Sequence, residues 1–290
     1  MPLTKEELLA IEAKAHEHRR TIIETTLCAG SGHIGGALSM IDVTTLLYSR
    51  FMRIDPDNAD WEDRDRFILS KGHAGIGFVA ILADIGYVDR KDLETFNLTG
   101  SNLGIHLDAS KVPGVDASTG SLGHGLSIAL GTALAAKQLG KEYRTFCLLG
   151  DGECQEGSVW EAAMAIAHFN PPNLVTFVDR NHAQIDGMTE DVMPLEPFAD
   201  KWRAFGFHTV TVDGHDFEAM NDAIRKALDR KDVPTCIILD TCKGKGIGFC
   251  EGNYRWHYGG ITQAMGEEAM RDLDAYYERR VAAIEQRGGE

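Results

Sequence analysis

The second half of the chain alternates between apolar, strand-like runs and helix-like runs, and this alternation limits the fold more than any other feature. The strand-like runs are YRTFCLLG from Tyr143, NLVTFVD from Asn173, HTVTV from His208 and TCIILDT from Thr235. Runs with helical spacing lie between them, at about 158–169, 198–205 and 217–228. Apolar strands that alternate with helices are typical of a parallel sheet covered on both faces. The pattern predicts an α/β fold with a doubly wound, mainly parallel sheet flanked by helices.

The first half adds two helical runs, a short strand and a long loop. Apolar residues recur at helical spacing over 4–28, and Thr4 with Glu7 fits a capping box. A glycine-rich loop, AGSGHIGG, separates this helix from a second helical run at about 39–51. RFILS at 66–70 predicts a buried strand that leads into SKGH and a helix, and 99–125 predicts a long functional loop. The last residues predict a charged helical tail that frays at RGGE.

Composition limits the partners of the protein. With 290 residues, 43% of them hydrophobic, the chain can bury the core of one large domain or of two small ones, and a single domain over 1–290 is the organisation expected. The net charge of -15 disfavours nucleic acids and anionic membranes, so a small metabolite is the expected partner. Six scattered cysteines without a C-x-x-C pair predict mostly buried thiols in a reducing compartment. Neither a signal peptide nor a run able to cross a bilayer is visible, so a soluble, cytoplasmic protein is expected.

The strongest functional signal is LLGDGECQEG, in which Asp151 stands between Gly150 and Gly152 directly after an apolar strand. Ligands of α/β proteins bind at this carboxyl edge of the sheet. The glycines permit close backbone approach, and the N-terminus of the following helix favours an anionic group such as phosphate. By itself, a GDG triplet is explained equally well as an ordinary strand-to-helix turn.

Asn181 ends the next strand, with residues 153–180 between it and the GDG triplet. The Asp151 carboxylate, the Asn181 amide oxygen and a nearby backbone carbonyl, that of Ala183, are hard oxygen ligands. They suit Mg²⁺ or Ca²⁺ shared with phosphates and do not suit zinc. An isolated Asn at a strand end is most often a turn residue. The spacing from GDG, one helix plus one strand, favours a metal ligand here.

These residues resemble the diphosphate and metal motif of thiamine-diphosphate enzymes, and the other motifs resemble transketolase in particular. The resemblance covers about 30–260. It rests on SGHIGG, LSKGHA, the IH of GIHLD, TGSLGHGLSIALG, GDGECQEG, the Asn181 loop ending in IDG, and KGKGIG followed by WH. Histidine-bearing loops in this order are specific to transketolase-like chains. The resemblance implies a thiamine diphosphate cofactor with Mg²⁺, for which Ca²⁺ or Mn²⁺ could substitute.

The resemblance also implies a role for each matching residue. Asp151, Asn181 and the Ala183 carbonyl would hold the metal, and Gly152, His73 and His257 would contact the diphosphate. His33 and His106, together with His257, would hydrogen-bond the hydroxyls and developing oxyanion of a ketose donor. The loop beside the aminopyrimidine is matched by Gly120, Ser121 and Leu122. Lys243 matches a basic residue near the site, and Glu156 matches a carboxylate near the subunit interface.

Some positions depart from the commonest family pattern. GHIGG replaces GHPG, Arg180 stands where an acidic residue is usual, and Ala183 replaces a bulkier residue whose carbonyl is the ligand. His124 stands where Gln is common, which leaves the donor preference open. The histidines outside the motifs are interpreted as ordinary surface or core residues: His16, His18, His168, His208 and His215. His124 and His182 stay undecided.

A second polypeptide is expected on the same grounds. In transketolases a separate pyrimidine-binding domain supplies the glutamate that activates the cofactor. After about residue 260 too few residues remain for that domain or for the family's C-terminal domain. The expectation is the N-terminal subunit of a split transketolase in an α2β2 assembly. It would transfer a two-carbon ketol unit from a ketose phosphate to an aldose.

Three other functions are open at this point. The α-subunit of a thiamine-dependent 2-oxo acid dehydrogenase, or a deoxyxylulose-phosphate-synthase-like enzyme, shares the metal motif but has no need of donor-binding histidines such as His33 and His106. A non-catalytic α/β binding module would not need Asp151, Asn181 and Glu156 together. A nucleotide-binding Rossmann domain is disfavoured because no G-x-G-x-x-G follows the first strand.

Overall fold

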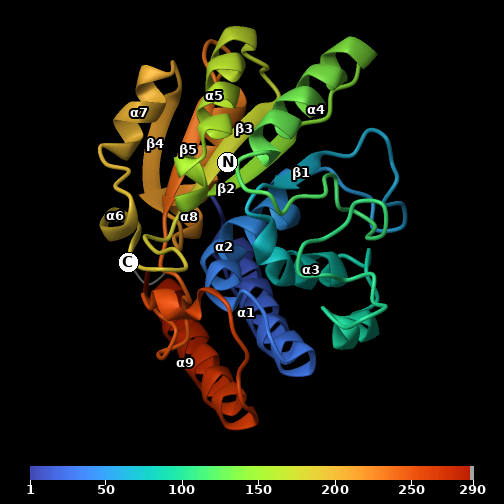
Figure 1. Ribbon diagram of the computed structural model, residues 1–290, viewed down its shortest axis with the longest axis vertical. Helices are drawn as coiled ribbons and strands as arrows, with labels where there is room; N and C mark the ends of the chain where they lie inside the picture. The colour runs from blue at the N-terminus through green and yellow to red at the C-terminus, as the bar shows by residue number, and fades with distance from the viewer. Residues whose placement is uncertain (288–290) are drawn as a thin grey trace.

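The computed structural model describes residues 1–287, which form one five-stranded, wholly parallel sheet flanked by helices (Figure 1). The strands are β1 (Arg66–Leu69), β2 (Thr145–Gly150), β3 (Leu174–Arg180), β4 (His208–Asp213) and β5 (Thr235–Asp240). Their order is β1-β2-β3-β5-β4, so the chain passes from β3 to the edge strand β4 and then returns to place β5 between them. The predicted doubly wound parallel sheet is confirmed.

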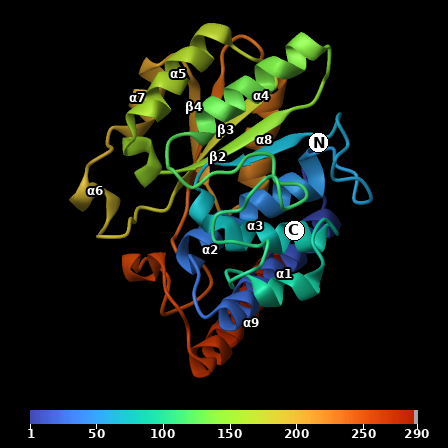
Figure 2. The same ribbon diagram turned by 45° about the vertical axis from the view of Figure 1, so that its right-hand side comes forward.

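Helices cover both faces of the sheet (Figures 1 and 2). The hydrophobic core on one face includes buried residues of α1 (Lys5–Ala29), α2 (Ile34–Leu46), α3 (Gly75–Asp84) and α8 (Phe217–Asp229). The other face packs against α4 (Gly125–Leu139), α5 (Gly157–Phe169) and α7 (Phe198–Ala204). Along β2, Phe146 and Leu148 enter the first core, whereas Cys147 and Leu149 enter the second. Because both faces of β2 are buried, its sequence is a continuous apolar run rather than an alternating one.

The first and the last helix of the described residues lie side by side. The predicted capping box is present, with Thr4 and Glu7 each accepting from the backbone N–H of the other. Helix α9 (Gln263–Arg287) lies along α1, where Arg280 forms a two-pronged ion pair with the buried Glu12. The part of the predicted frayed tail at 288–290 lies outside the described residues. No helix among residues 1–287 combines the length and the apolar character that a membrane crossing requires.

Two elements differ from the prediction. Helix α2 begins at Ile34 instead of about Ser39, and it continues into a π-helical turn at Leu47–Phe51. Half of the predicted glycine-rich loop is therefore helix. At Gly35 a Cβ atom would lie 2.5 Å from the carbonyl oxygen of Trp256, so this glycine provides close packing and not a turn. Helix α4 is also an element that the strand and helix pattern did not predict.

The carboxyl ends of the parallel strands meet at one edge of the sheet, and short helical segments occupy that edge. These segments are Gly72–Ala74 after β1, Gly152–Gln155 after β2, α6 (Thr189–Val192) after β3, and Tyr254–His257 after β5. A further 3-10 segment, Arg90–Thr95, follows α3. The loop predicted at 99–125 contains no helix or strand before α4 begins. This edge is where α/β proteins bind ligands.

Candidate functional site

A cavity of ≈ 380 Å³ opens at the carboxyl ends of β1, β2 and β3. All but one of the site residues predicted from the sequence line it: His33, His73, His106, Gly120, Leu122, Asp151, Gly152, Glu156, Asn181, Ala183, Lys243 and His257. Ser121 lies on the same loop as Gly120 and Leu122, but it is exposed and outside the cavity lining. Loops more than 200 residues apart in the chain therefore meet in a single concave site.

The predicted histidines form one cluster. The ring centre of His33 lies 5.1 Å from that of His73, 5.3 Å from that of His257 and 6.4 Å from that of His106. His73 and His257 stack with their centres 5.0 Å apart. Each ring comes from a different segment, so only the tertiary structure brings them together.

Three histidines of this cluster, His33, His73 and His257, are held neutral. Burial, aided by the positive charges of Lys243 and Lys71, lowers the pKa of His33 to about 4 and that of His257 to about 3. Burial and Lys71 also hold the pKa of His73 well below its ordinary value. A neutral imidazole has one donor and one acceptor nitrogen, which suits recognition of hydroxyl groups.

Acid is expected to destabilise the folded chain through His33 and His257. As the pH falls below 6.5, these imidazoles take up protons in the unfolded chain but not in the folded one until about pH 4 or 3. The free energy of unfolding should therefore fall as the pH drops through this window. Urea unfolding at a series of pH values measures it. In His33→Gln the free energy of unfolding should fall less with acid than in the wild type. His124→Gln, at an exposed histidine, is the control. Equal pH profiles of the unfolding free energy for wild type and His33→Gln would contradict the prediction.

The Asp151 carboxylate is buried and held in a fixed orientation. Its Oδ2 accepts hydrogen bonds from the His182 N–H at 2.9 Å, the Thr189 hydroxyl at 3.1 Å and the Arg180 guanidinium at 3.1 Å. Among residues 1–287, its Oδ1 accepts only from the Gly152 N–H, at 2.7 Å. Burial and the neighbouring Asp179 raise the pKa of Asp151. A cation bound at Oδ1 would favour the ionised form, because opposite charges lower a carboxyl pKa.

Asn181 and Ala183 complete a set of oxygen donors. Both are buried, and Asn181 donates from Nδ2 to Asp179 at 3.0 Å, which leaves its Oδ1 toward the Ala183 segment. Ala183 and Met188 form an isolated antiparallel bridge whose hydrogen bonds run through the flanking residues, so the turn does not use the Ala183 carbonyl. A carboxylate, an amide oxygen and a carbonyl are the ligands that Mg²⁺ accepts. The residues present therefore fit the predicted metal.

Two buried lysines give the cavity the charge that a diphosphate requires. Lys243 Nζ lies 3.3 Å from His257 Nδ1, and burial together with Lys71 lowers the pKa of Lys243 to about 8. Lys71 donates to the Gly36 carbonyl at 2.8 Å and pairs with the buried Asp179. Lys71 was not predicted as a site residue, although it stands in the SKGH motif, because a motif does not show which side chain turns inward.

The two glutamates of GDGECQEG have different surroundings. Glu153 is buried and accepts hydrogen bonds from the Ser70 hydroxyl and from the N–H groups of Gly123 and Gly150. Burial raises its pKa. Glu156, the predicted interface carboxylate, is exposed at the rim of the cavity and precedes α5. Other lining residues that the sequence did not predict are Gln155, Gln184, Ile185 and Asp186.

Arg180 and His124, two of the departures from the family pattern, and the undecided His182 have separate surroundings. Arg180 is buried and links Asp151 to Glu190, at 2.6 Å, and to Glu196, at 3.1 Å. His182 has a φ of 62° and its Nε2 pairs with Asp240 at 2.7 Å, so it ties the metal-ligand loop to the end of β5. His124 is exposed, precedes α4 and is not part of the cavity lining.

The fold and the site define a class of protein: an α/β domain with a ligand cavity at the carboxyl edge of a parallel sheet, lined by histidines, lysines and oxygen donors. Residues 12–277 match the family model described as transketolase, thiamine diphosphate binding domain. The chain therefore belongs to the transketolase family of transferases, as predicted.

Known relatives agree with this membership. A 6-deoxy-6-sulfo-D-fructose transketolase subunit from Clostridium sp. (strain MSTE9) is 40% identical over 269 residues, which cover 93% of this chain and 98% of that protein. One subunit of the apulose-4-phosphate transketolase of Phocaeicola vulgatus is also 40% identical, over 93% of this chain and 95% of that protein. A transketolase variant from Pichia stipitis superposes with a TM-score of 0.85 and 29% identity, over 95% of this chain and 44% of that one.

Proposed function

We propose that this chain is the diphosphate-binding subunit of a two-subunit transketolase that transfers a two-carbon ketol unit from a ketose phosphate to an aldose. One observation carries the proposal: four histidines, two lysines and three oxygen donors for Mg²⁺ converge on a single cavity. The relatives that match almost end to end are named as subunits of transketolases. All six cysteines are free thiols, which is consistent with the expected cytoplasmic location.

Each group has a distinct task in the proposed reaction. Bound thiamine diphosphate supplies an electron sink for cleavage of the carbon–carbon bond next to a ketose carbonyl. Asp151, Asn181 and the Ala183 carbonyl would hold Mg²⁺. Gly152, His73, His257 and Lys243 would bind the diphosphate, and the loop at 120–122 would support the aminopyrimidine end. The neutral ring of His33 and the ring of His106 would orient the donor hydroxyls and stabilise developing negative charge on oxygen.

Exposed apolar side chains support a second polypeptide as partner. Ile128 on α4 and Met164 on α5 are 38% and 56% exposed, on neighbouring helices of one face of the sheet. Ile185 is also exposed and lines the cavity. Exposed apolar side chains on neighbouring helices are typical of a protein interface. We infer that a second polypeptide covers this face and closes the cavity, and that two such pairs form an α2β2 assembly.

The names of the relatives support a proposal for the class of ketose donor. The two relatives above are named for a sulfonated ketose and for a phosphorylated ketose, so a ketose with an anionic end is the donor that we propose. The alternative, a 2-oxo acid dehydrogenase or deoxyxylulose-phosphate-synthase-like subunit, shares the Asp151 and Asn181 motif. The clustering of His33 and His106 at the cavity favours the transketolase reaction.

His33→Ala and His106→Ala are each expected to lower kcat/KM with a ketose phosphate donor by roughly 10²-fold, since each removes an oriented hydrogen bond from the transition state. The affinity for thiamine diphosphate should change much less. Steady-state kinetics of the assembled enzyme give the first quantity and calorimetry gives the second. His208→Ala, on the distant strand β4, is the control. Unslowed ketose cleavage in both variants, with decarboxylation of pyruvate instead, would favour the dehydrogenase function.

A further inference from the structure

A chain of buried polar groups leads from helix α1 to the wall of the cavity. Arg19 donates to Asp42 through both guanidinium arms, at 2.9 and 2.6 Å. Asp42 Oδ2 accepts from Nδ1 of His215 at 2.8 Å, and His215 Nε2 accepts from the Cys242 N–H at 2.9 Å. Arg19, Asp42 and His215 are 2%, 1% and 7% exposed. His215 is one of the histidines interpreted from the sequence as ordinary surface or core residues, and both of its ring nitrogens are hydrogen-bonded in the core.

The hydrogen bonds determine the tautomer of His215. A backbone N–H can only donate, so Nε2 must accept from Cys242 and the proton must lie on Nδ1, which donates to Asp42. Although burial alone would raise it, the charge of Arg19 and the contact with His215 hold the pKa of Asp42 well below its ordinary value. A carboxylate that stays ionised keeps the imidazole in one orientation. The acceptor nitrogen is therefore aimed at the Cys242 backbone.

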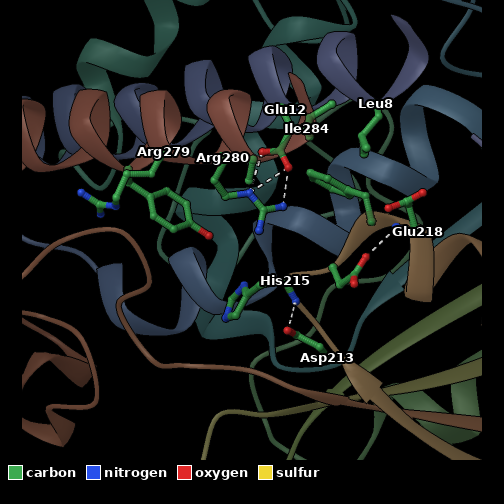
Figure 3. A pocket seen from close by; sticks show the side chains of 12 residues that line it. Leu8, Glu12, Asp213, His215, Glu218, Arg279, Arg280 and Ile284 are labelled. Carbon is green, nitrogen blue, oxygen red and sulfur yellow. Dashed lines mark hydrogen bonds and ion pairs between the residues drawn. The ribbon is translucent and has the colours of Figure 1, made fainter. Parts of the chain in front are cut away.

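The turn that carries His215 is packed against the end of β5. A Cβ atom at Gly214 would lie 2.4 Å from Cγ2 of Thr241, so only glycine permits this approach. The Gly214 N–H donates to the Asp240 carbonyl at 2.8 Å. The His215 N–H donates to Asp213 at 2.8 Å, and Figure 3 shows His215 between Asp213 and the ion pair of Glu12 with Arg280. The backbone N–H groups of both Gly214 and His215 are therefore hydrogen-bonded, which fixes the backbone from which the His215 side chain projects.

Lys243 directly follows the peptide that His215 holds. Its side chain passes close to Gly35, where a Cβ atom would lie 2.8 Å from Lys243 Cγ, and its Nζ ends 3.3 Å from His257 Nδ1. The peptide that follows Lys243 is also held in place, because the Gly244 N–H donates to the Gly35 carbonyl at 3.0 Å. The direction in which Lys243 leaves the backbone is therefore set by the Cys242 and Gly244 anchors.

We propose that His215 is a positioning residue for Lys243: by accepting from the Cys242 N–H it directs the Lys243 ammonium to the cavity. The statement that this ammonium binds a diphosphate rests on the proposed function, whereas the positioning itself rests on the contacts above. Asp42 orients His215, and Arg19 in turn orients Asp42, through the hydrogen bonds described above. The ring of Tyr276 on α9 covers Arg19, with its centre 5.3 Å from the guanidinium carbon.

Two substitutions of His215 each keep one of its two side-chain hydrogen bonds and remove the other. In His215→Asn the amide occupies the place of Nδ1 and can still donate to Asp42, but it is too short to reach Cys242. In His215→Gln the amide oxygen occupies the place of Nε2 and can still accept from Cys242. His18→Ala is the matched control, because His18 is also buried and hydrogen-bonded, to Thr45 at 2.8 Å, but has no contact with the cavity.

Competitive acetylation of the full chain at a series of pH values, read by peptide mass spectrometry, measures the pKa of Lys243. We expect about 8 in the wild type, in His215→Gln and in His18→Ala. In His215→Asn, Lys243 should leave its buried place and its pKa should rise toward about 10.4. The other groups around the amine stay unchanged in every variant: Lys71, Asp151, Asp179, His33, His73 and His257.

Calorimetry of the assembled enzyme provides the second readout, and His215→Asn should weaken thiamine diphosphate binding by about tenfold, as loss of one charge-assisted contact does. An unchanged Lys243 pKa in His215→Asn, or an equal rise in His18→Ala or His215→Gln, would overturn the proposal. If His215→Asn does not fold, Gly214→Ala, which pushes the same turn away from Thr241, decides by the same labelling. If the wild-type assembly does not bind thiamine diphosphate, the proposed function is wrong. The Lys243 pKa measured by acetylation would still test the positioning role of His215.

Discussion

Purified alone and supplied with thiamine diphosphate and Mg²⁺, this chain is expected to be at least about 10³-fold less active in ketol transfer than the assembled enzyme, because in the proposed assembly the partner supplies the activating carboxylate and excludes water from the cofactor. The cavity is open at a rim formed by exposed residues, among them His106, Glu156 and Ile185. One side of a bound cofactor would therefore remain in water. Addition of a polypeptide that bears the pyrimidine-binding domain should restore activity.

The measurement is a ketol-transfer assay of the chain before and after titration with the candidate partner, with circular dichroism to establish that the lone chain is folded. Activity should rise with the partner concentration and saturate at a fixed ratio of the two chains. Substantial turnover by the demonstrably pure lone chain would overturn the two-subunit proposal. It would then require an activating carboxylate within the chain itself.

Asp151→Ala is expected to abolish Mg²⁺-dependent binding of thiamine diphosphate to the assembled enzyme, by roughly 10³-fold or more, because it removes the charged ligand of the metal. The fold should survive. Arg180, which loses one partner, keeps its ion pairs with Glu190 and Glu196. Asp151→Asn should show nearly the same loss, since an amide keeps the shape of the side chain without its charge.

Calorimetric titration with thiamine diphosphate, with and without Mg²⁺, measures this effect. Asp191→Ala is the control, because Asp191 is an exposed carboxylate on the neighbouring segment α6 and does not line the cavity. If Asp151→Ala binds the cofactor with unchanged affinity and unchanged Mg²⁺ dependence, Asp151 is not a metal ligand. The same loss in Asp191→Ala would instead indicate a general effect of lost negative charge.

Local sequence patterns were sufficient for the strands and for the residues at their ends. The apolar runs of β2 and β3 are visible in the sequence because both faces of these strands are buried, and Asp151 and Asn181 directly follow them. The histidine loops were found by motif, and the structure brings them to one cavity. Helix α2 was predicted to begin too late, because the packing of Gly35 against Trp256 depends on residues more than 200 positions away.

The sequence by itself determined the parallel α/β fold, the family and most of the cavity lining, because these depend on periodicity and on motifs at strand ends. Tertiary structure alone decided which similar residues turn inward. It buried Glu153 and left Glu156 exposed, through a contact with Ser70 that spans 83 positions. It also distinguished His215 from the other histidines outside the motifs, through a bond to Asp42 across 173 positions. Burial and partner choice depend on contacts between distant segments, and no local pattern encodes them.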